Sequence, residues 1–154
     1  MIVFAAISVS LYLLDLLTKA LVRARMPLGS EIEILPFFSL VHLENTGIAF
    51  GFFQGKNHLF MLAGLIVMAA MVFLGYRMLR DDRFSAYAIA TVIGGGLGNL
   101  TDRFLRGRVT DFLDFYWGAH HWPAFNVADS AICVGATLLI LREFMHKKNV
   151  SRPV

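Results

Sequence analysis

The sequence predicts an all-α membrane protein, a four-transmembrane-helix bundle that carries a small β-sheet. Three observations predict this fold. Hydrophobic residues make up 57% of the 154 residues, whereas soluble domains average about 45 to 50% even when glycine is counted. Four apolar segments each approach the ~20 residues that a helix needs to cross a bilayer. The basic residues are scattered along the junctions between these segments. We therefore expect one membrane domain, residues 1–154.

The first predicted helix covers residues 2–22. It lacks a basic N-terminal region and a clear cleavage site, and Asp15 and Lys19 interrupt its second half. We therefore interpret it as a mature helix and not as a signal peptide. Asp15, Thr18 and Lys19 have helical spacing on one face, and an ion pair between Asp15 and Lys19 is one interpretation of that face.

The next stretch, residues 23–57, is polar and rich in turn residues. Its apolar runs at 32–35 and 38–41 resemble short strands separated by Pro36. They predict a small sheet that lies on the membrane surface. Residues 44–51 have the composition of a tight turn, because Asn and Gly adopt the backbone angles that turns require.

The second and third predicted helices cover residues 58–79 and 84–105. The connection between them, residues 77–83, is short and highly charged. Short connections of this kind join antiparallel neighbours. We therefore expect these two helices to pack side by side.

Glycines and polar residues share the third helix. Gly94 and Gly98 are one turn apart, which allows a neighbouring backbone to approach closely. Asn99, Asp102 and Arg103 then lie on one face at i, i+3 and i+4. The alternative is that the glycines serve only packing and that Asp102 pairs with Arg103 or Arg106 for stability.

The fourth predicted helix covers residues 122–144. The connection before it, residues 103–121, carries Asp111 and ends in amphipathic aromatic residues that favour the membrane interface. Within the helix, Asn126, Asp129, Ser130 and Cys133 form one stripe that can face the third helix. Asp129 could instead be a helix-start residue at the positive end of the helix dipole, although its distance from Trp122 argues against this.

Cys133 is the only cysteine. A single cysteine excludes an intramolecular disulfide and a cysteine-based zinc cluster. We expect Cys133 to pack within the fourth helix. The sequence has no metalloprotease, serine-hydrolase or phosphate-loop motif either. The net charge of +3 comes without the aromatic-interleaved basic stripe that is typical of nucleic-acid binding, so anionic lipid headgroups are the expected counterpart.

Four spans place both termini and the 77–83 turn on one side of the membrane. The other side then holds residues 23–57 and 103–121, with Asp111 and Asp129 near it. The 14 Lys and Arg residues divide seven against seven, so the positive-inside rule does not decide the orientation. The dense 77–83 turn and the basic tail give a slight preference for placing the termini in the cytoplasm.

Asp111 and Asp129 carry the functional signal. Ionisable groups at the edge of a membrane helix are costly, so they indicate function, and two carboxylates in one site share a proton. A proton relay through Asp15, Asp102, Asp111 and Asp129 is the alternative, but it requires carboxylates at several depths, whereas these fall toward one surface. A structural bundle without chemistry would leave the polar clusters unexplained.

The chain carries five motifs in order. They are Asp15-x-x-Thr18-Lys19, Asn45-Thr46-Gly47 with Ala49-Phe50, Gly94-Gly95-x-x-Gly98-Asn99-x-x-Asp102-Arg103, Val109-x-Asp111-Phe112 and Phe125-Asn126-x-Ala128-Asp129-Ser130. Together they resemble the bacterial lipoprotein signal peptidase (signal peptidase II) family over essentially the whole chain. The resemblance implies an aspartic endopeptidase of the bacterial inner membrane, with several spans, cytoplasmic termini and an active site toward the periplasmic or outer face. Members of the family cut prolipoproteins just before a diacylglyceryl-modified cysteine.

The resemblance also implies the roles of individual residues. The catalytic pair maps onto Asp111 and Asp129, and a small extracytoplasmic sheet and a short helical flap map onto residues 23–57 and part of 103–121. Thr110 departs from the family, which commonly has an aliphatic residue there. We expect no cofactor or metal, a monomer, and prolipoproteins and membrane lipids as partners. The supporting residues would be Asn99, Asp102, Arg103 and Asn126, with Asp15, Lys19 and Asn45 as further motif positions, and the residues guiding acyl chains would be Phe50, Phe52 and Phe53.

Overall fold

The computed structural model describes residues 1–46 and 57–150. Within them it contains four long helices and a four-stranded antiparallel sheet. Most of the predicted turn at 44–51 lies outside the described residues, and so do Phe50, Phe52 and Phe53.

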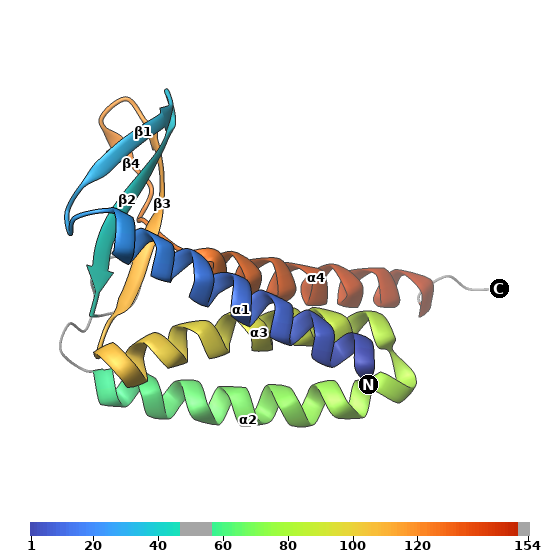
Figure 1. The fold of residues 1–154 in the computed structure, drawn as a ribbon. Helices are drawn as coiled ribbons and strands as arrows, with labels where there is room; N and C mark the ends of the chain where they lie inside the picture. Colours follow the sequence, from blue (N-terminus) through green and yellow to red (C-terminus); the bar gives the residue numbers. More distant parts are fainter. Residues whose placement is uncertain (47–56, 151–154) are drawn as a thin grey trace.

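The helices run alongside one another and form the elongated part of the molecule (Figure 1). All four predicted helices are present, although the last begins at Val127 and not at Trp122. Helix α3 packs against each of the other three. The bounds are α1 (Ile2–Arg25), α2 (Asn57–Asp81), α3 (Arg83–Arg106) and α4 (Val127–Val150).

Glycines allow α3 to occupy this central position. A β-carbon on Gly94 would lie 2.7 Å from the carbonyl oxygen of Ser8 on α1, and one on Gly95 would overlap the carbonyl oxygen of Ala128 on α4. The predicted packing role of the glycines is therefore confirmed, because only glycine lets both neighbouring backbones come so close.

The sheet stands at one end of the helices, away from the helix axes (Figure 1). Its first two strands fall where the sequence predicts them. The third was not expected, since residues 103–121 were interpreted as a connection that follows the membrane interface. The resemblance also implies a short helical flap in residues 23–57 and part of 103–121, and beyond α3 no residue up to His121 is helical. The strands are β1 (Glu31–Leu35), β2 (Phe38–Asn45), β3 (Val109–Trp117) and β4 (His120–His121), in the order β1-β2-β3-β4.

Strand β3 pairs with the edge of β2 that β1 leaves free. The N–H and C=O groups of such an edge readily pair with another strand, and β3 is rich in the β-branched and aromatic residues that favour strands. Leu43 of β2 lies opposite Asp111 of β3 in this antiparallel pair. The sheet therefore brings Asp111 and Asn45, at the end of β2, to the same end of the molecule.

The α2–α3 turn and the N-terminus lie at the end of the bundle opposite the sheet, and α4 also ends there (Figure 1). Asp82 begins α3 by accepting a hydrogen bond from the N–H of Ser85 (3.3 Å). Arg142 on α4 donates to the same carboxylate (2.9 Å), and this hydrogen bond lowers the pKa of Asp82 to about 2. The charged turn therefore joins three helices.

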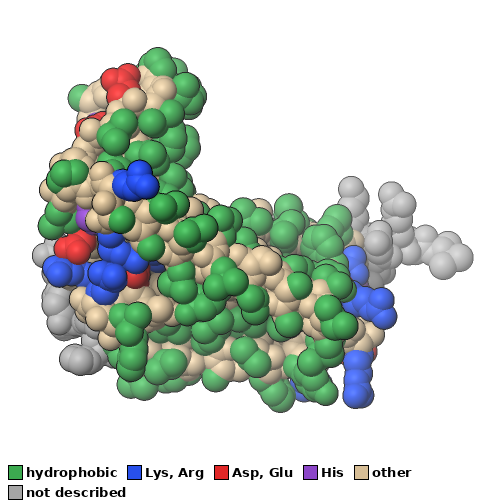
Figure 2. All heavy atoms as spheres, in the orientation of Figure 1, with side chains coloured by type: hydrophobic (Ala, Val, Ile, Leu, Met, Phe, Trp, Pro, Cys, Tyr) green, Lys and Arg blue, Asp and Glu red, His purple; other side chains and the backbone are tan. Residues whose placement is uncertain are grey.

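The outer surface of the helices is largely hydrophobic, and basic side chains gather at both ends (Figure 2). Among the described residues, Ile2–Arg25 and Met61–Asp81 are long and apolar enough to cross a membrane, and only 17% and 6% of their apolar windows are buried. A soluble protein would bury such helices. Helices α3 and α4 have similar lengths but carry more polar residues, several of which face the bundle interior.

Candidate active site

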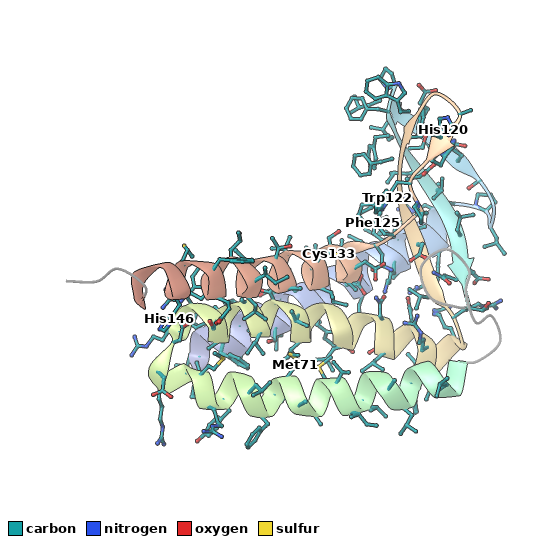
Figure 3. All side chains as sticks on the ribbon, turned by 180° about the vertical axis from the view of Figure 1, so that it is seen from behind. Met71, His120, Trp122, Phe125, Cys133 and His146 are labelled. Carbon is teal, nitrogen blue, oxygen red and sulfur yellow. The ribbon has the colours of Figure 1, made fainter. Side chains whose placement is uncertain are left out.

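Asp111 and Asp129 line one cavity of about 490 Å³. Asp111 comes from β3 and Asp129 from the first turn of α4. The cavity lies in the angle between the sheet and α4, where Figure 3 shows Trp122, Phe125 and Cys133. Among the described residues, the lining is Asn45, Asn99, Arg103, Val109, Asp111, Trp122, Pro123, Ala124, Phe125, Asp129, Ser130, Ile132 and Cys133.

Asp129 is held by the start of α4. Its N–H donates to the side-chain oxygen of Asn126 (3.0 Å), and its Oδ2 accepts from the N–H of Asn126 (3.3 Å). This reciprocal pair is a capping box. Asp129 therefore lies at the start of a helix, as the alternative interpretation held. The objection that it lies too far beyond Trp122 is wrong, because the helix begins at Val127. The segment before Asn126 is extended, because Phe125 pairs with Leu113 of β3.

Asn126 contacts both carboxylates. Its backbone N–H donates to Asp129, while its side-chain Nδ2 donates to Oδ1 of Asp111 over 2.7 Å. The side chain is fully buried, so it has no access to competing water. One residue thereby fixes the position of the two acids relative to each other.

Asp111 is 4% exposed and accepts a second hydrogen bond from Nδ2 of Asn45 (3.1 Å). Burial, and then the negative charge of Asp129, raise the pKa of Asp111 to about 7. Both effects penalise the charged form. Asp111 is therefore able to hold a proton near neutral pH while a second carboxylate lines the same cavity.

Asn99 connects the acids to a buried charge cluster. Its Nδ2 donates to Oδ1 of Asp129 (2.7 Å), and its Oδ1 accepts from Nζ of Lys19 (2.9 Å). Lys19 is fully buried and lies 2.8 Å from Asp15 and 3.2 Å from Asp102. Because an ammonium can only donate, it orients the Asn99 oxygen toward itself and the amide nitrogen toward Asp129.

Asp15 has two partners. The ion pair with Lys19 is confirmed, and Oδ1 of Asp15 also accepts from the N–H of Ala128 (2.8 Å) in the first turn of α4. A carboxylate in this position satisfies an otherwise free helix donor. Gly98 provides the space, because a β-carbon there would overlap the Asp15 carboxylate.

Asp102 and Arg103 differ in position. Arg103 lines the cavity, and its Nη1 donates to the carbonyl oxygen of Asn99 (3.5 Å). Asp102 does not line it. It accepts from the N–H of Thr110 (3.2 Å) and pairs with Lys19, with Arg23 and, over 3.9 Å, with the expected partner Arg106.

The four membrane-edge aspartates thus form one connected cluster. Lys19 joins Asp15 to Asp102, and Asn126 joins Asp111 to Asp129. A proton relay would require these acids to be spaced along the bundle, which they are not. Within the described ranges, no three His, Cys, Asp or Glu side chains gather as metal ligands do.

Two expectations about neighbouring residues have clear outcomes. Ser130 lines the cavity and donates to the carbonyl oxygen of Asn126 (2.9 Å). Cys133 lies in α4, as expected, and also lines the cavity, but its side chain is exposed and not packed. Asp114 is not among the described lining residues of the cavity and pairs with His121 (2.8 Å) on the sheet.

Sequence reasoning missed Arg23 and Thr110. Nη1 of Arg23 donates to Oγ1 of Thr110 over 2.9 Å, next to Asp111 in the chain. The helical spacing of Asp15, Lys19 and Arg23, each four residues after the last, would have indicated that Arg23 faces the same side of α1.

Comparisons with known proteins agree on one family. The family model described as signal peptidase (SPase) II matches residues 7–145. Lipoprotein signal peptidases from Maridesulfovibrio salexigens and Geobacter metallireducens are 43% and 41% identical, over 92% and 97% of this chain and 94% and 95% of their own. The Vibrio cholerae protein of that name is 40% identical over 90% of this chain and 84% of its own.

Solved structures extend the likeness to the fold. One bacterial membrane enzyme matches with a TM-score of 0.87 and 31% identity, over 98% of this chain and 93% of its own. A second matches with a TM-score of 0.78 and 33% identity, over 90% of both chains. The chain therefore belongs to the signal peptidase II family of lipoprotein signal peptidases.

Proposed function

We propose that this protein is an intramembrane aspartic endopeptidase that removes signal peptides from prolipoproteins, cutting just before a diacylglyceryl-modified cysteine. Membership of a family of lipoprotein signal peptidases supports the reaction. The observation that carries the assignment of the catalytic residues is that Asp111 and Asp129 line one cavity and share Asn126 as a hydrogen-bond donor.

In the proposed chemistry, one of the two carboxyls is protonated and the other is charged. Two carboxylates in one poorly hydrated site do not both ionise. The raised pKa of Asp111 favours it as the proton carrier, which donates to the carbonyl oxygen of the scissile bond. Asp129 accepts from Asn99 and from the backbone of Asn126, as a carboxylate does, and takes a proton from the attacking water.

The other site residues support this chemistry. Lys19 and Asp15 hold Asn99 and the start of α4, as their contacts above indicate. Arg103 and Asn45 line the cavity, where they are placed to bind substrate backbone. That backbone must unwind locally, because a helical peptide uses its carbonyl groups in its own hydrogen bonds.

Replacement of each acid tests the catalytic pair. Asp111→Asn and Asp129→Asn should each abolish cleavage of a prolipoprotein by purified enzyme in detergent, since general acid-base help of roughly 10² to 10⁴-fold is lost together with activation of the water. Asp114→Asn is the matched control, because it makes the same change on the same strand outside the cavity, and it should keep activity. Near-normal turnover by either cavity variant would refute the assignment.

We further propose that all four helices cross the inner membrane as one domain, residues 1–154, with cytoplasmic termini and an extracytoplasmic sheet. The hydrophobic outer surface and the basic side chains at both ends (Figure 2) support the crossing, and the orientation follows the family resemblance. We propose a monomer, because the chain itself supplies both acids and the asparagines that contact them. A reporter fused after Lys148 should be active only in the cytoplasm, and one inserted near Lys56 only outside. An external tail reporter would overturn the orientation.

The substrate's lipid should contribute most of the recognition. The cavity wall is largely apolar, with Val109, Trp122, Phe125 and Ile132 among its residues, and burial of each CH₂ contributes about 0.8 kcal/mol. One prolipoprotein should therefore be cleaved far faster with diacylglycerol than without it, in the same detergent and at matched concentration. Equal rates would instead indicate a general intramembrane aspartic protease.

A further inference from the structure

Thr110, the residue before Asp111, is held at each of its polar groups. Its N–H donates to Oδ2 of Asp102 on α3 (3.2 Å), and its carbonyl oxygen accepts from Nδ2 of Asn126 at the start of α4 (3.3 Å). Its hydroxyl accepts from Nη1 of Arg23 on α1 (2.9 Å). Thr110 is 2% exposed, so these three helices and not solvent determine where this part of β3 lies.

Arg23 in turn needs the Thr110 hydroxyl as a hydrogen-bond acceptor. Its side chain is only 16% exposed, and the Nη1 atom that contacts Thr110 also lies 3.3 Å from Oδ1 of Asp102. Asp102 also pairs with Lys19 and Arg106, so its carboxylate is shared among three cations. A guanidinium nitrogen at such a depth needs every acceptor within reach, because an unsatisfied buried donor is costly.

We propose that Arg23 and the hydroxyl of Thr110 are positioning residues for Asp111. Neither lines the cavity. Consecutive strand residues point to opposite faces, so Arg23 holds the strand from the face opposite the one that presents Asp111. The inference rests on the proposed catalytic role of Asp111. Displacement of a reacting group by about 1 Å can cost roughly 100-fold in rate.

Two substitutions of Thr110 separate positioning from packing. Thr110→Val keeps the shape and removes the hydroxyl, whereas Thr110→Ser keeps the hydroxyl and removes the methyl group. Positioning by the hydroxyl predicts a kcat about 10- to 100-fold lower in Thr110→Val with KM unchanged, and a kcat restored in Thr110→Ser. A purely packing role predicts the opposite order, and that order would overturn the proposal.

Arg23→Gln tests the other partner. It should lower kcat to a similar extent, and the double variant with Thr110→Val should lose no more than the worse single variant, because both remove the same contact. Multiplied losses would mean that the two residues act separately, which would overturn the proposal. Arg25→Gln is the matched control: it removes the same charge from an exposed position at the end of α1, and it should leave kcat unchanged.

Thermal unfolding in detergent accompanies each measurement. If Thr110→Val does not fold, Arg23→Gln alone decides: a lower kcat at unchanged KM supports the proposal, and an unchanged kcat overturns it. Failure of the proposed function is separately visible, because it would appear as an active Asp111→Asn variant whatever the Thr110 variants do.

Discussion

Replacement of Asp111 by asparagine should inactivate the enzyme and yet stabilise its fold at alkaline pH. The pKa of Asp111 is raised from 3.8 to about 7, so the folded protein holds this proton more tightly than the unfolded chain does. The stability that the protonated form contributes is fully present below about pH 3.8 and is lost as the pH rises to about 7. Above that pH the folded state contains a buried charge that asparagine lacks.

The size of the effect follows from the shift. About three pKa units at 1.36 kcal/mol each correspond to a cost of about 4 kcal/mol above pH 7. Solvent provides little relief, since Asp111 is 4% exposed. The substitution also has a cost. The two carboxylate oxygens of Asp111 accept from Asn45 and from Asn126, whereas asparagine has a single side-chain oxygen and so loses one of these hydrogen bonds, which costs about 1 kcal/mol. A net gain of about 3 kcal/mol remains at pH 8.

The assay is thermal unfolding of both proteins in the same detergent and ionic strength, from pH 4 to pH 8. At pH 4 the variant should be no more stable than the unaltered protein, and its advantage in Tm should grow up to about pH 7 and then level off. Glu33→Gln, which removes an exposed carboxylate from β1, should not change Tm at pH 8. A variant that is less stable at pH 8, or a difference independent of pH, would refute the reasoning.

Three other changes follow from contacts already described. Gly98→Ala should lower Tm and kcat together, by about 1 to 3 kcal/mol in stability, because its β-carbon displaces Asp15; Gly96→Ala meets only the flexible end of a methionine side chain and should be milder in both measurements. Alkylation of Cys133 with N-ethylmaleimide should block cleavage through the cavity it lines, and a Cys133→Ser variant should resist the reagent; full activity after complete labelling would show that substrate does not enter there. Asp82→Ala should lower stability by about 1 kcal/mol through the cap of α3 and leave kcat unchanged, and a lost kcat would contradict this.

Apolar length predicted the four helices well, because the segments that cover the outer surface are nearly continuous in hydrophobic residues. It failed at the start of α4. Residues 122–126 are mostly apolar, and a short apolar run does not distinguish an extended segment from a helix. What places Val127 at the helix start is the pairing of Phe125 with Leu113, a contact between distant parts of the chain.

The same limit explains what was missed in the site. Motif resemblance named Asp111, Asp129, Asn99, Asn126 and Asn45, and the structure places all five around one cavity or in contact with it. Resemblance could not reveal how they are held, since a hydrogen bond from α1 to β3 depends on packing and not on local spacing. The β-branched and aromatic residues of β3 did indicate a strand. The same residues were instead interpreted as a connection at the membrane interface.

The ion pair within α1 also bears on how the chain enters the membrane during synthesis. The ribosome delivers Lys19 before Asp102 or α4 exists, and an unpaired charge in an inserting helix is costly, up to about 2.5 to 3.5 kcal/mol at the helix centre. Asp15, one turn earlier and 2.8 Å away, provides a counter-charge from the same segment. Helix α1 should therefore pass from the translocon into lipid on its own, and Asp15→Asn should lower the inserted fraction of an isolated α1 in microsomes.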